Sequence, residues 1–340
     1  RPPIYTLLDI RRQRQMCIRD SAQGVYLNAI SWLNQQVVPI VAVDIPSGVS
    51  ASTGQILGTA VRASLTVTFA FAKVGLVSYP GAGMVGDLVT LDIGIPEKVT
   101  SQVVADCKWV DSAEASCLLP VRRQDGHKGS FGHLLVVAGS TGKCGAAVMS
   151  AESGLRGGAG LVTLACPQTV QPVIASRLTE VMTAPVADFE GEIHSQSLGA
   201  LLSLAAGKQA LALGPGLGVA AETGALIRRL IQDAALPMVI DADGLTALSG
   251  YTNVLDQLSG RPIVLTPHPG EMARLTAKSV NEIQADRVSV ARDFAVRHHV
   301  VLVLKGARTL IAAPDGLVHV NSTGHAGLAS GGMGDVLTGL

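Results

Sequence analysis

The most informative part of the sequence is Ser330-Gly331-Gly332-Met333-Gly334-Asp335-Val336-Leu337-Thr338. Its glycines followed by Asp-Val-Leu-Thr predict a loop that runs directly into a helix. Free backbone N–H groups and the helix dipole make such a start an anion-binding site, and glycine lets the backbone come close to phosphate oxygens. Asp335 would stand in the first turn, where a carboxylate can take a proton from a hydroxyl that attacks phosphorus. Taken alone, the stretch fits a second interpretation equally well, in which it is a glycine-rich turn and Asp335 caps the helix.

In the residues before this loop, short aliphatic strands alternate with helices. The expected strands are 133–137, 161–164, 211–213, 237–240, 263–265 and 300–304, the expected helices lie over 145–157 and around 226–231 and 290–294, and a hairpin joins 310–312 to 318–320. Polar or glycine clusters repeatedly follow the strands. In open α/β sheets the ligand crevice lies at the carboxyl ends of the strands, so these clusters predict one site.

The first third of the chain has its own strands, which we expect at 37–43, 65–69 and 87–93. Periodicity then fades between residues 96 and 124, which indicates a boundary. We therefore expect a first domain over 22–105, a linker over 106–126 and a second domain over 127–340. Residues 1–21 show no clear period, and either a disordered tail or foreign sequence explains them.

Composition excludes several classes of protein. The chain has 340 residues, of which 26 are basic and 26 acidic. It therefore lacks the net positive charge that would favour a nucleic acid or an acidic membrane as partner. Aromatic residues make up only 3%, so the cores must be aliphatic, as in α/β proteins. The five cysteines form no CxxC pair, which favours free thiols in a reducing, cytoplasmic compartment. No apolar run approaches the length of a membrane span.

Gly331-Gly332-Met333-Gly334-Asp335 resembles the anion-hole and catalytic-base motif of ribokinase-like enzymes. Further segments resemble one branch of them, the ADP- or ATP-dependent NAD(P)H-hydrate dehydratases. They are His127-Lys128-Gly129-Ser130-Phe131-Gly132, Leu213-Gly214-Pro215-Gly216-Leu217-Gly218, Asp241-Ala242-Asp243-Gly244-Leu245, Thr266-Pro267-His268-Pro269-Gly270-Glu271 and Lys305-Gly306-Ala307-Arg308-Thr309. The resemblance covers 127–340 and implies a three-layer ribokinase-like α/β domain.

The resemblance also implies roles for individual residues. Asp335 would be the catalytic base and contact the substrate. Other substrate contacts would be Gly145, Ala146, Gly216 and His268. The adenine nucleotide (ADP or AMP) would contact Lys305, Gly306, Ala307, Arg308, Thr309 and Gly334.

Some of these residues also have ordinary structural interpretations. His268 alone fits a loop histidine with satisfied hydrogen bonds, and Lys305 fits a solvated lysine. Asp241 and Asp243 either belong to the site or merely cap a helix.

The implied chemistry is coherent. Hydrated NADH carries a hydroxyl at C6 of a reduced ring, and hydroxide is a poor leaving group. Phosphorylation converts the hydroxyl to phosphate, which the electrons of the ring nitrogen can expel. The implied cofactors are ADP (or ATP) as phosphoryl donor and Mg²⁺ to offset the phosphate charge.

The first domain resembles part of a Rossmann-like NAD(P)H-hydrate epimerase domain, through Ala42-Val43-Asp44-Ile45-Pro46-Ser47-Gly48-Val49 and two later segments. The resemblance implies that Asp44 contacts substrate and that Ser47 helps to ligate K⁺. The alternative is a strand-end turn built by Pro46 and Gly48. The Asn-Asn-Gly-Gly-Asp loop of that family does not occur in this sequence, so we expect a bifunctional enzyme truncated at both ends, with epimerase activity only in the intact protein.

Two other functions stay open. One is a small-molecule kinase of the same fold, against which Thr266-Pro267-His268-Pro269-Gly270-Glu271 and the first domain argue. The other is a non-catalytic binding protein, against which the intact Asp335 motif argues. By resemblance alone, the protein is expected to be a homo-oligomer.

Overall fold

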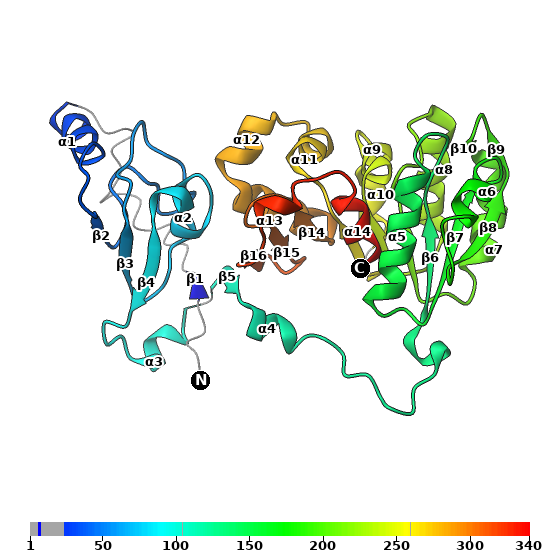
Figure 1. Ribbon diagram of the computed structural model, residues 1–340, viewed down its shortest axis with the longest axis horizontal. Coiled ribbons are helices and arrows are strands. Elements are labelled where there is room, and N and C mark those ends of the chain that lie inside the picture. The colour runs from blue at the N-terminus through cyan, green and yellow to red at the C-terminus, as the bar shows by residue number, and fades with distance from the viewer. Residues whose placement is uncertain (1–5, 8–23, 104, 259) are drawn as a thin grey trace.

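The computed structural model describes residues 6–7, 24–103, 105–258 and 260–340 (Figure 1). It contains a small region, built on three parallel strands, and a large region, built on an eleven-stranded sheet. Most of the expected tail 1–21 therefore lies outside the described residues, as does Cys17. Within it, only β1 (Thr6–Leu7) is described, and it pairs antiparallel with β5.

The large sheet has the strand order β1-β5-β16-β15-β14-β13-β12-β11-β6-β7-β8. The bounds of its strands after β1 are β5 (Cys107–Val110), β16 (Val318–Asn321), β15 (Leu310–Ala312), β14 (Val301–Leu304), β13 (Ile263–Leu265), β12 (Met238–Ile240), β11 (Ala210–Leu213), β6 (His133–Val137), β7 (Leu161–Pro167) and β8 (Met182–Val186). The pairs from β14 to β8 are all parallel. Because Leu213 pairs with Ile240 and Ile240 with Leu265, the loops that follow these strands meet at one edge.

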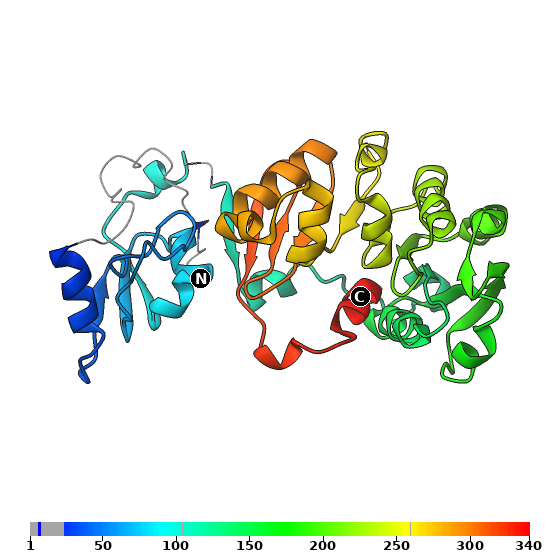
Figure 2. The same ribbon diagram turned by 90° about the horizontal axis from the view of Figure 1, so that it is seen from above.

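Helices cover both faces of this sheet, giving the expected three layers (Figures 1 and 2). Their bounds are α5 (Cys144–Gly157), α6 (Gln171–Ala175), α7 (Leu198–Ala205), α8 (Ala221–Asp233), α9 (Asp243–Leu248), α10 (Asn253–Asp256), α11 (Pro269–Thr276), α12 (Val280–Ala285), α13 (Arg287–His298) and α14 (Met333–Gly339). A short hairpin, β9 (Asp188–Phe189) and β10 (Glu192–Ile193), follows β8. After β16 the chain crosses to the other side of the large region, where α14 packs on α5 (Figure 2).

The core is aliphatic, and its two halves lie on opposite faces of the sheet. Along β6, Leu135 and Val137 belong to one buried cluster, whereas Val136 and the following Ala138 belong to the other. This is the period of two that a strand imposes. Burying one such side chain stabilises the fold by about 1.5–3 kcal/mol, so the alternating aliphatic runs are sufficient to place the helices on both faces.

The small region is a parallel sheet of β2 (Val41–Val43), β3 (Leu65–Phe69) and β4 (Asp87–Leu91), with α1 (Val25–Leu33), α2 (Val74–Val77) and α3 (Glu97–Thr100). β2 starts later than the expected residue 37, because Pro39 has no N–H to donate, and Val37 is fully exposed. Gln55 Nε2 donates to the carbonyl of Gln284 at 2.9 Å, which links this region to α12.

The expected linker 106–126 is partly structured. Its first residues form β5, which pairs parallel with β16 in the large sheet, and α4 (Ser112–Ser116) follows. The run Cys107-Lys108-Trp109-Val110 was too short and mixed to be recognised as a strand. The boundaries of the domains themselves stay a prediction.

Two predictions from composition can be compared with the described residues. Cys117, Cys144 and Cys166 are free thiols there, and burial raises the pKa of Cys166 to about 12. In the part of the chain that the structure describes, no helix is long and apolar enough to cross a membrane.

Candidate active site

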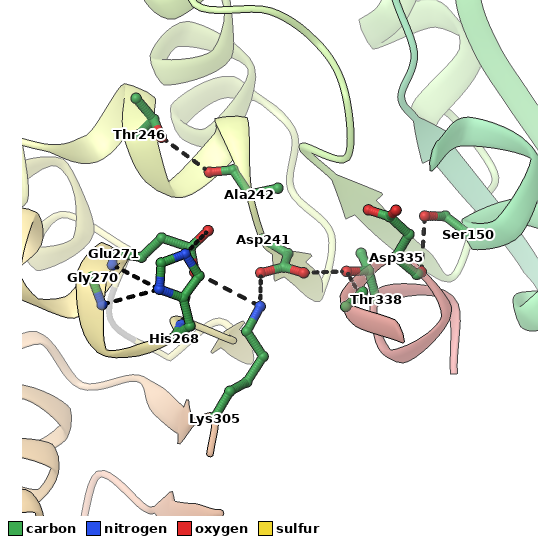
Figure 3. Close-up of polar contacts among 11 residues, drawn as sticks. Ser150, Asp241, Ala242, Thr246, His268, Gly270, Glu271, Lys305, Asp335 and Thr338 are labelled. Carbon is green, nitrogen blue, oxygen red and sulfur yellow. Dashed lines mark hydrogen bonds and ion pairs between the residues drawn. The ribbon is translucent and has the colours of Figure 1, made fainter. Parts of the chain in front are cut away.

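Asp335 lies in the first turn of α14, directly after the glycine-rich loop, as the sequence predicts. Gly332 begins the helix with a φ of 91°, and a Cβ there would lie 2.6 Å from the sulfur of Met149. The hydroxyl of Ser150 on α5 donates to the backbone carbonyl of Asp335 at 2.9 Å (Figure 3). At the other end of the helix, a Cβ on Gly339 would lie 2.0 Å from the Ser150 carbonyl. α14 is therefore fixed on α5 by close backbone contact.

A buried ion pair stands opposite this helix. Lys305, which follows β14, donates to Asp241 Oδ1 at 2.7 Å, and the hydroxyl of Thr338 on α14 donates to Asp241 Oδ2 at 2.8 Å (Figure 3). The side chain of Asp241 is only 2% exposed and that of Lys305 20%. Lys305 also lies 3.7 Å from Glu271 Oε2. One carboxylate thus joins the ends of β12 and β14 to α14.

The electrostatics around Asp335 favour a base. Its pKa is raised above the ordinary carboxyl value, first because the side chain is half-buried and then because Asp241 is negatively charged. The ammonium of Lys305 opposes this effect, and Asp243 adds a little to it. A carboxylate with a raised pKa holds a proton more strongly, which suits proton abstraction from a hydroxyl.

His268 is the N-cap of α11. Its Nδ1 accepts the backbone N–H groups of Gly270 at 3.0 Å and Glu271 at 3.3 Å, while Glu271 Oε2 accepts the N–H of His268 at 2.8 Å (Figure 3). Since Nδ1 accepts, the neutral ring carries its proton on Nε2. The side chain is 52% exposed, so this N–H can donate to a ligand while the other nitrogen keeps its structural role.

The expected substrate residues Gly145, Ala146 and Gly216 come together between α5 and β11. Gly216 has a φ of 64°, and a Cβ on it would lie 3.2 Å from the Cβ of Ala146. Beside them, Asp243 Oδ2 accepts from Lys143 Nζ and from the N–H of Gly218, each at 2.9 Å. This bridge ties the glycine-rich turn to the start of α5.

The expected nucleotide residues 305–309 form the turn between β14 and β15. Arg287 supports this turn, because its Nη2 donates to the carbonyls of Leu304 at 3.1 Å and Lys305 at 3.2 Å. Gly306 has a φ of 139°, and a Cβ on it would lie 3.0 Å from Arg287 Nη1. Arg308 reaches the carbonyl of Ser322 and lies over the Trp109 ring, with 4.9 Å between the guanidinium carbon and the ring centroid.

The remaining residues of this segment fall nearby. Thr309 donates through its hydroxyl to the carbonyl of Gly306 at 2.9 Å. Ala307 lies in the same turn. Gly334, on α14, lies beside the ion pair, since a Cβ on it would lie 3.5 Å from Lys305 Nζ and 3.6 Å from Asp241 Oδ2.

Asp44 and Ser47 lie apart from this cluster, in the small region. Asp44 follows β2 with a φ of 67°; it forms an ion pair with Lys73 and accepts the Thr68 hydroxyl at 3.0 Å. Ser47 is exposed, and its carbonyl accepts the N–H of Val61 at 2.9 Å. The K⁺ role of Ser47 stays a prediction.

The geometry decides between several of the interpretations left open by the sequence. Neither Asp335 nor Asp243 caps its helix, because Gly332 and Ala242 occupy the N-cap positions of α14 and α9 without side-chain cap bonds. Lys305 is not a solvated lysine. The sequence marked Asp241 as a candidate through its motif and Thr338 only as part of the glycine-rich stretch, and it gave no signal that their side chains meet.

The described residues contain no group of three His, Cys, Asp or Glu side chains arranged to hold a metal ion. An Mg²⁺ bound here would therefore take most of its ligands from nucleotide phosphates and water, which is a common arrangement for this ion. Asp241 and Glu271 are the buried carboxylates nearest to Lys305.

Comparison with known proteins is consistent with this geometry. Residues 134–340 match the family model described as NAD(P)H-hydrate dehydratase, and residues 16–75 match that of the YjeF-related protein N-terminus. The second match begins within the expected tail 1–21. Among solved structures, the ADP/ATP-dependent NAD(P)H-hydrate dehydratase from Bacillus subtilis, co-crystallised with ATP/Mg²⁺, matches with a TM-score of 0.55 and 34% identity, over 67% of this chain and 76% of that one. A ribokinase-like superfamily protein from Enterococcus faecalis matches with a TM-score of 0.59 at 23% identity, over 70% and 79% of the two chains, which concerns the fold alone.

Curated relatives match both regions together. The bifunctional NAD(P)H-hydrate repair enzyme Nnr of Moorella thermoacetica is 43% identical over 323 residues, which are 95% of this chain and 61% of that protein. The Nnr of Escherichia coli is 36% identical over 324 residues, 95% and 59% of the two chains. The chain therefore spans less than two thirds of the length of these relatives.

Fold and site together define a protein of ribokinase-like α/β fold in which a half-buried carboxylate stands at the glycine-rich start of a helix. Within that class, the chain belongs to the NAD(P)H-hydrate dehydratase family, joined to part of a YjeF-related N-terminal domain. The family resemblance noted in the sequence is confirmed.

Proposed function

We propose that the large region dehydrates hydrated NADH or NADPH at the expense of a nucleoside phosphate. The observation that carries this proposal is the position of Asp335: a half-buried carboxylate at the glycine-rich start of α14, facing the Asp241–Lys305 ion pair. A base, backbone amides and an ammonium thus converge where a hydroxyl and a phosphoryl group can meet.

In the proposed reaction, Asp335 takes the proton of the C6 hydroxyl as that oxygen forms its bond to the terminal phosphorus of ADP. The bond from this phosphorus to the leaving oxygen breaks, and AMP departs. The amides at the start of α14 and Lys305 stabilise the charge on the transferred group. The electron pair of the ring nitrogen then expels phosphate from C6, and loss of a proton from the adjacent C5 restores NAD(P)H. Mg²⁺ bound to the nucleotide offsets phosphate charge.

The remaining assignments are supported by resemblance. His268, through Nε2–H, and the Gly216, Gly145 and Ala146 surfaces contact the hydrated ring, while 305–309 and Gly334 contact the nucleotide. We take ADP rather than ATP as the donor because of the fused first region. We also propose a homo-oligomer in the cytoplasm.

The small region is proposed to be part of an epimerase that interconverts the R and S forms of the hydrate. Asp44 would contact the substrate, and Ser47 would help to hold K⁺. The test is to add R hydrate with KCl to this chain and to the full-length protein; activity in the full-length protein alone supports the assignment to the intact enzyme.

The dehydration is tested by absorbance at the NADH band. The full-length protein is mixed with S hydrate, MgCl₂ and either ADP or ATP. Recovery of the band that requires nucleotide supports the proposal, and the more effective nucleotide names the donor. No recovery by a folded protein that binds nucleotide would favour a small-molecule kinase of the same fold, whose phosphorylated product would accumulate.

A further inference from the structure

Asp241 is a buried carboxylate whose two oxygens bind two different structural elements. Oδ1 accepts from Lys305 Nζ at 2.7 Å and Oδ2 accepts from the Thr338 hydroxyl at 2.8 Å (Figure 3). Its side chain is 2% exposed, and a carboxylate is tolerated at such a depth only when it is paired and hydrogen-bonded. The residue therefore links the turn after β14 to α14.

We propose that Asp241 is a positioning residue of the dehydration site, which holds the Lys305 ammonium and the base-bearing helix α14 in one fixed relation. The inference rests on the proposed function, because it concerns the same site. Asp241 itself need not touch substrate or nucleotide to fill this role.

The relation of Asp241 to Asp335 follows from helix geometry. Thr338 lies three residues after Asp335, so the two share one side of α14. Thr338 is 2% exposed, and its hydroxyl also contacts the carbonyl of Gly334 at 3.0 Å. A Cβ on Gly334 would lie within 3.6 Å of the ion pair. A shift of the Asp241 carboxylate would therefore displace the helix start and the ammonium together.

Only a carboxylate accepts at both positions and carries a charge. Asparagine at 241 can accept from Lys305 and donate to the Thr338 hydroxyl, which then keeps the Gly334 carbonyl as its acceptor, but it removes the negative charge that pairs with the ammonium. If Lys305 lost Asp241, the ion-pair partner left to it would be Glu271, at 3.7 Å on α11, while Asp335 on α14 would still act on it electrostatically. The ammonium would then no longer be held in its position beside Thr338.

Removing Asp241 should also change the titration of Asp335. The charged groups that face Asp335 come from three elements: Asp241 after β12, Asp243 on α9 and Lys305 after β14. The charge of Asp241 is one cause of the raised pKa of Asp335, so Asp241→Asn should lower that pKa. The acid limb of the rate profile, along which the base loses its proton, would move to lower pH.

The experiment compares variants of the full-length enzyme. In Asp241→Asn we expect kcat to fall by about 10- to 100-fold, the effect of small displacements of reacting groups, with weaker nucleotide binding and an acid limb at lower pH. Thr338→Val keeps every charge, so it should lower kcat without moving the limb, and Thr338→Ser should restore activity. Asp233→Asn, an exposed partner of Arg229 on α8, should change neither.

Wild-type kcat and an unmoved acid limb in Asp241→Asn would overturn the proposal. If circular dichroism shows that Asp241→Asn does not fold, Thr338→Val and its rescue by serine test the proposal instead. An unchanged kcat in Thr338→Val then overturns the proposal. Calorimetry with ADP and MgCl₂ and NMR titration of the Asp335 carboxyl need no hydrated dinucleotide. If the wild type fails to dehydrate but Asp241→Asn still weakens ADP binding and lowers that titration, the proposed function fails and the positioning role stands.

Discussion

The two regions each contain an aspartate at the end of a parallel strand, paired with a lysine and a threonine hydroxyl. In the small region Asp44 pairs with Lys73, and in the large region Asp241 pairs with Lys305. The Asp44 side chain is 42% exposed, whereas that of Asp241 is 2% exposed. The two clusters have the same composition and both lysines are largely covered, but the carboxylate is open to solvent in the small region and closed off in the large one.

The difference lies in where the threonine comes from. Thr68 belongs to β3, the strand next to β2, so the small cluster assembles from neighbouring strands. Thr338 lies 97 residues after Asp241, on a helix that packs across the end of the sheet. Because α14 closes the second cluster, its ion pair is shielded from water, and removing one partner of a shielded pair costs far more than removing one partner of an exposed pair.

The largest effect is expected at Asp335, the proposed base, which faces the closed cluster. Asp335→Asn should lower kcat by about 10²- to 10⁴-fold, the usual contribution of general base catalysis, and should keep nucleotide affinity because the amides of α14 remain. Steady-state kinetics and calorimetry with ADP measure the two effects. Asp125→Asn, at an exposed carboxylate, is the matched control. If nucleotide binding disappears together with turnover, Asp335 is structural.

The same substitution should stabilise the protein at high pH. The folded-state pKa of Asp335 is raised, first by burial, so its contribution to stability is present at low pH and is lost as the pH rises through that pKa. Asn carries no such charge. Urea unfolding at pH 8 should therefore favour the variant, with little difference near pH 4; equal midpoints at both pH values would contradict this sign.

These contrasts also indicate what the sequence could predict. Strands β6, β7 and β11 to β14 were recognisable because buried parallel strands are short aliphatic runs, and the start of α14 because of its glycines, whereas β5 and β8 were not among the expected strands. The Asp241–Thr338 contact was not, since no local pattern joins residues so far apart. His268 illustrates a mixed case: its motif marked a site, but only the fold shows that Nδ1 is already used as a helix cap.

The next prediction compares the loss of stability when each of the two paired aspartates is replaced by alanine. Asp241→Ala leaves a buried lysine without its partner and should lower the free energy of unfolding by about 3–5 kcal/mol. Asp44→Ala should cost less, about 1 kcal/mol, because its carboxylate is 42% exposed and the pair is screened by water on that side. The two tryptophans allow region-specific measurement, because Trp32 lies on α1 and Trp109 on β5.

In a Trp32→Phe background, Trp109 fluorescence follows urea unfolding of the large region, and in Trp109→Phe, Trp32 follows the small one. Each alanine substitution should act mainly on the transition of its own region. Equal losses at Asp44 and Asp241 would mean that burial does not distinguish the two clusters.

A smaller effect tests the helix that closes the cluster. A Cβ on Gly339 would lie 2.0 Å from both the Ser150 carbonyl and the Ser153 hydroxyl, so Gly339→Ala should push α14 from α5 and cost about 1–3 kcal/mol. Gly199 in α7 has no atom within 4 Å of its Cβ position, and alanine there should stabilise by about 0.5–1 kcal/mol. Thermal unfolding and kcat measure both variants. A fully active, stable Gly339→Ala would show that α14 docks loosely.

The smallest effect is expected at Lys73, whose ammonium donates to Asp44, to the Thr68 hydroxyl at 2.8 Å and to the Phe69 carbonyl at 3.1 Å. Burial raises the pKa of Asp44, but the hydrogen bond and charge of Lys73 outweigh it, so the net pKa is lowered. The stability that this pair contributes is therefore present above the unfolded pKa of an aspartate and is lost as the pH falls through the folded one.

Lys73→Met should destabilise the small region by less than about 1 kcal/mol at pH 7. In Trp32-monitored urea unfolding, wild type and variant should converge on acidification. If the difference instead persists at low pH, Lys73 stabilises the region by packing, and the open cluster differs from the closed one in more than exposure.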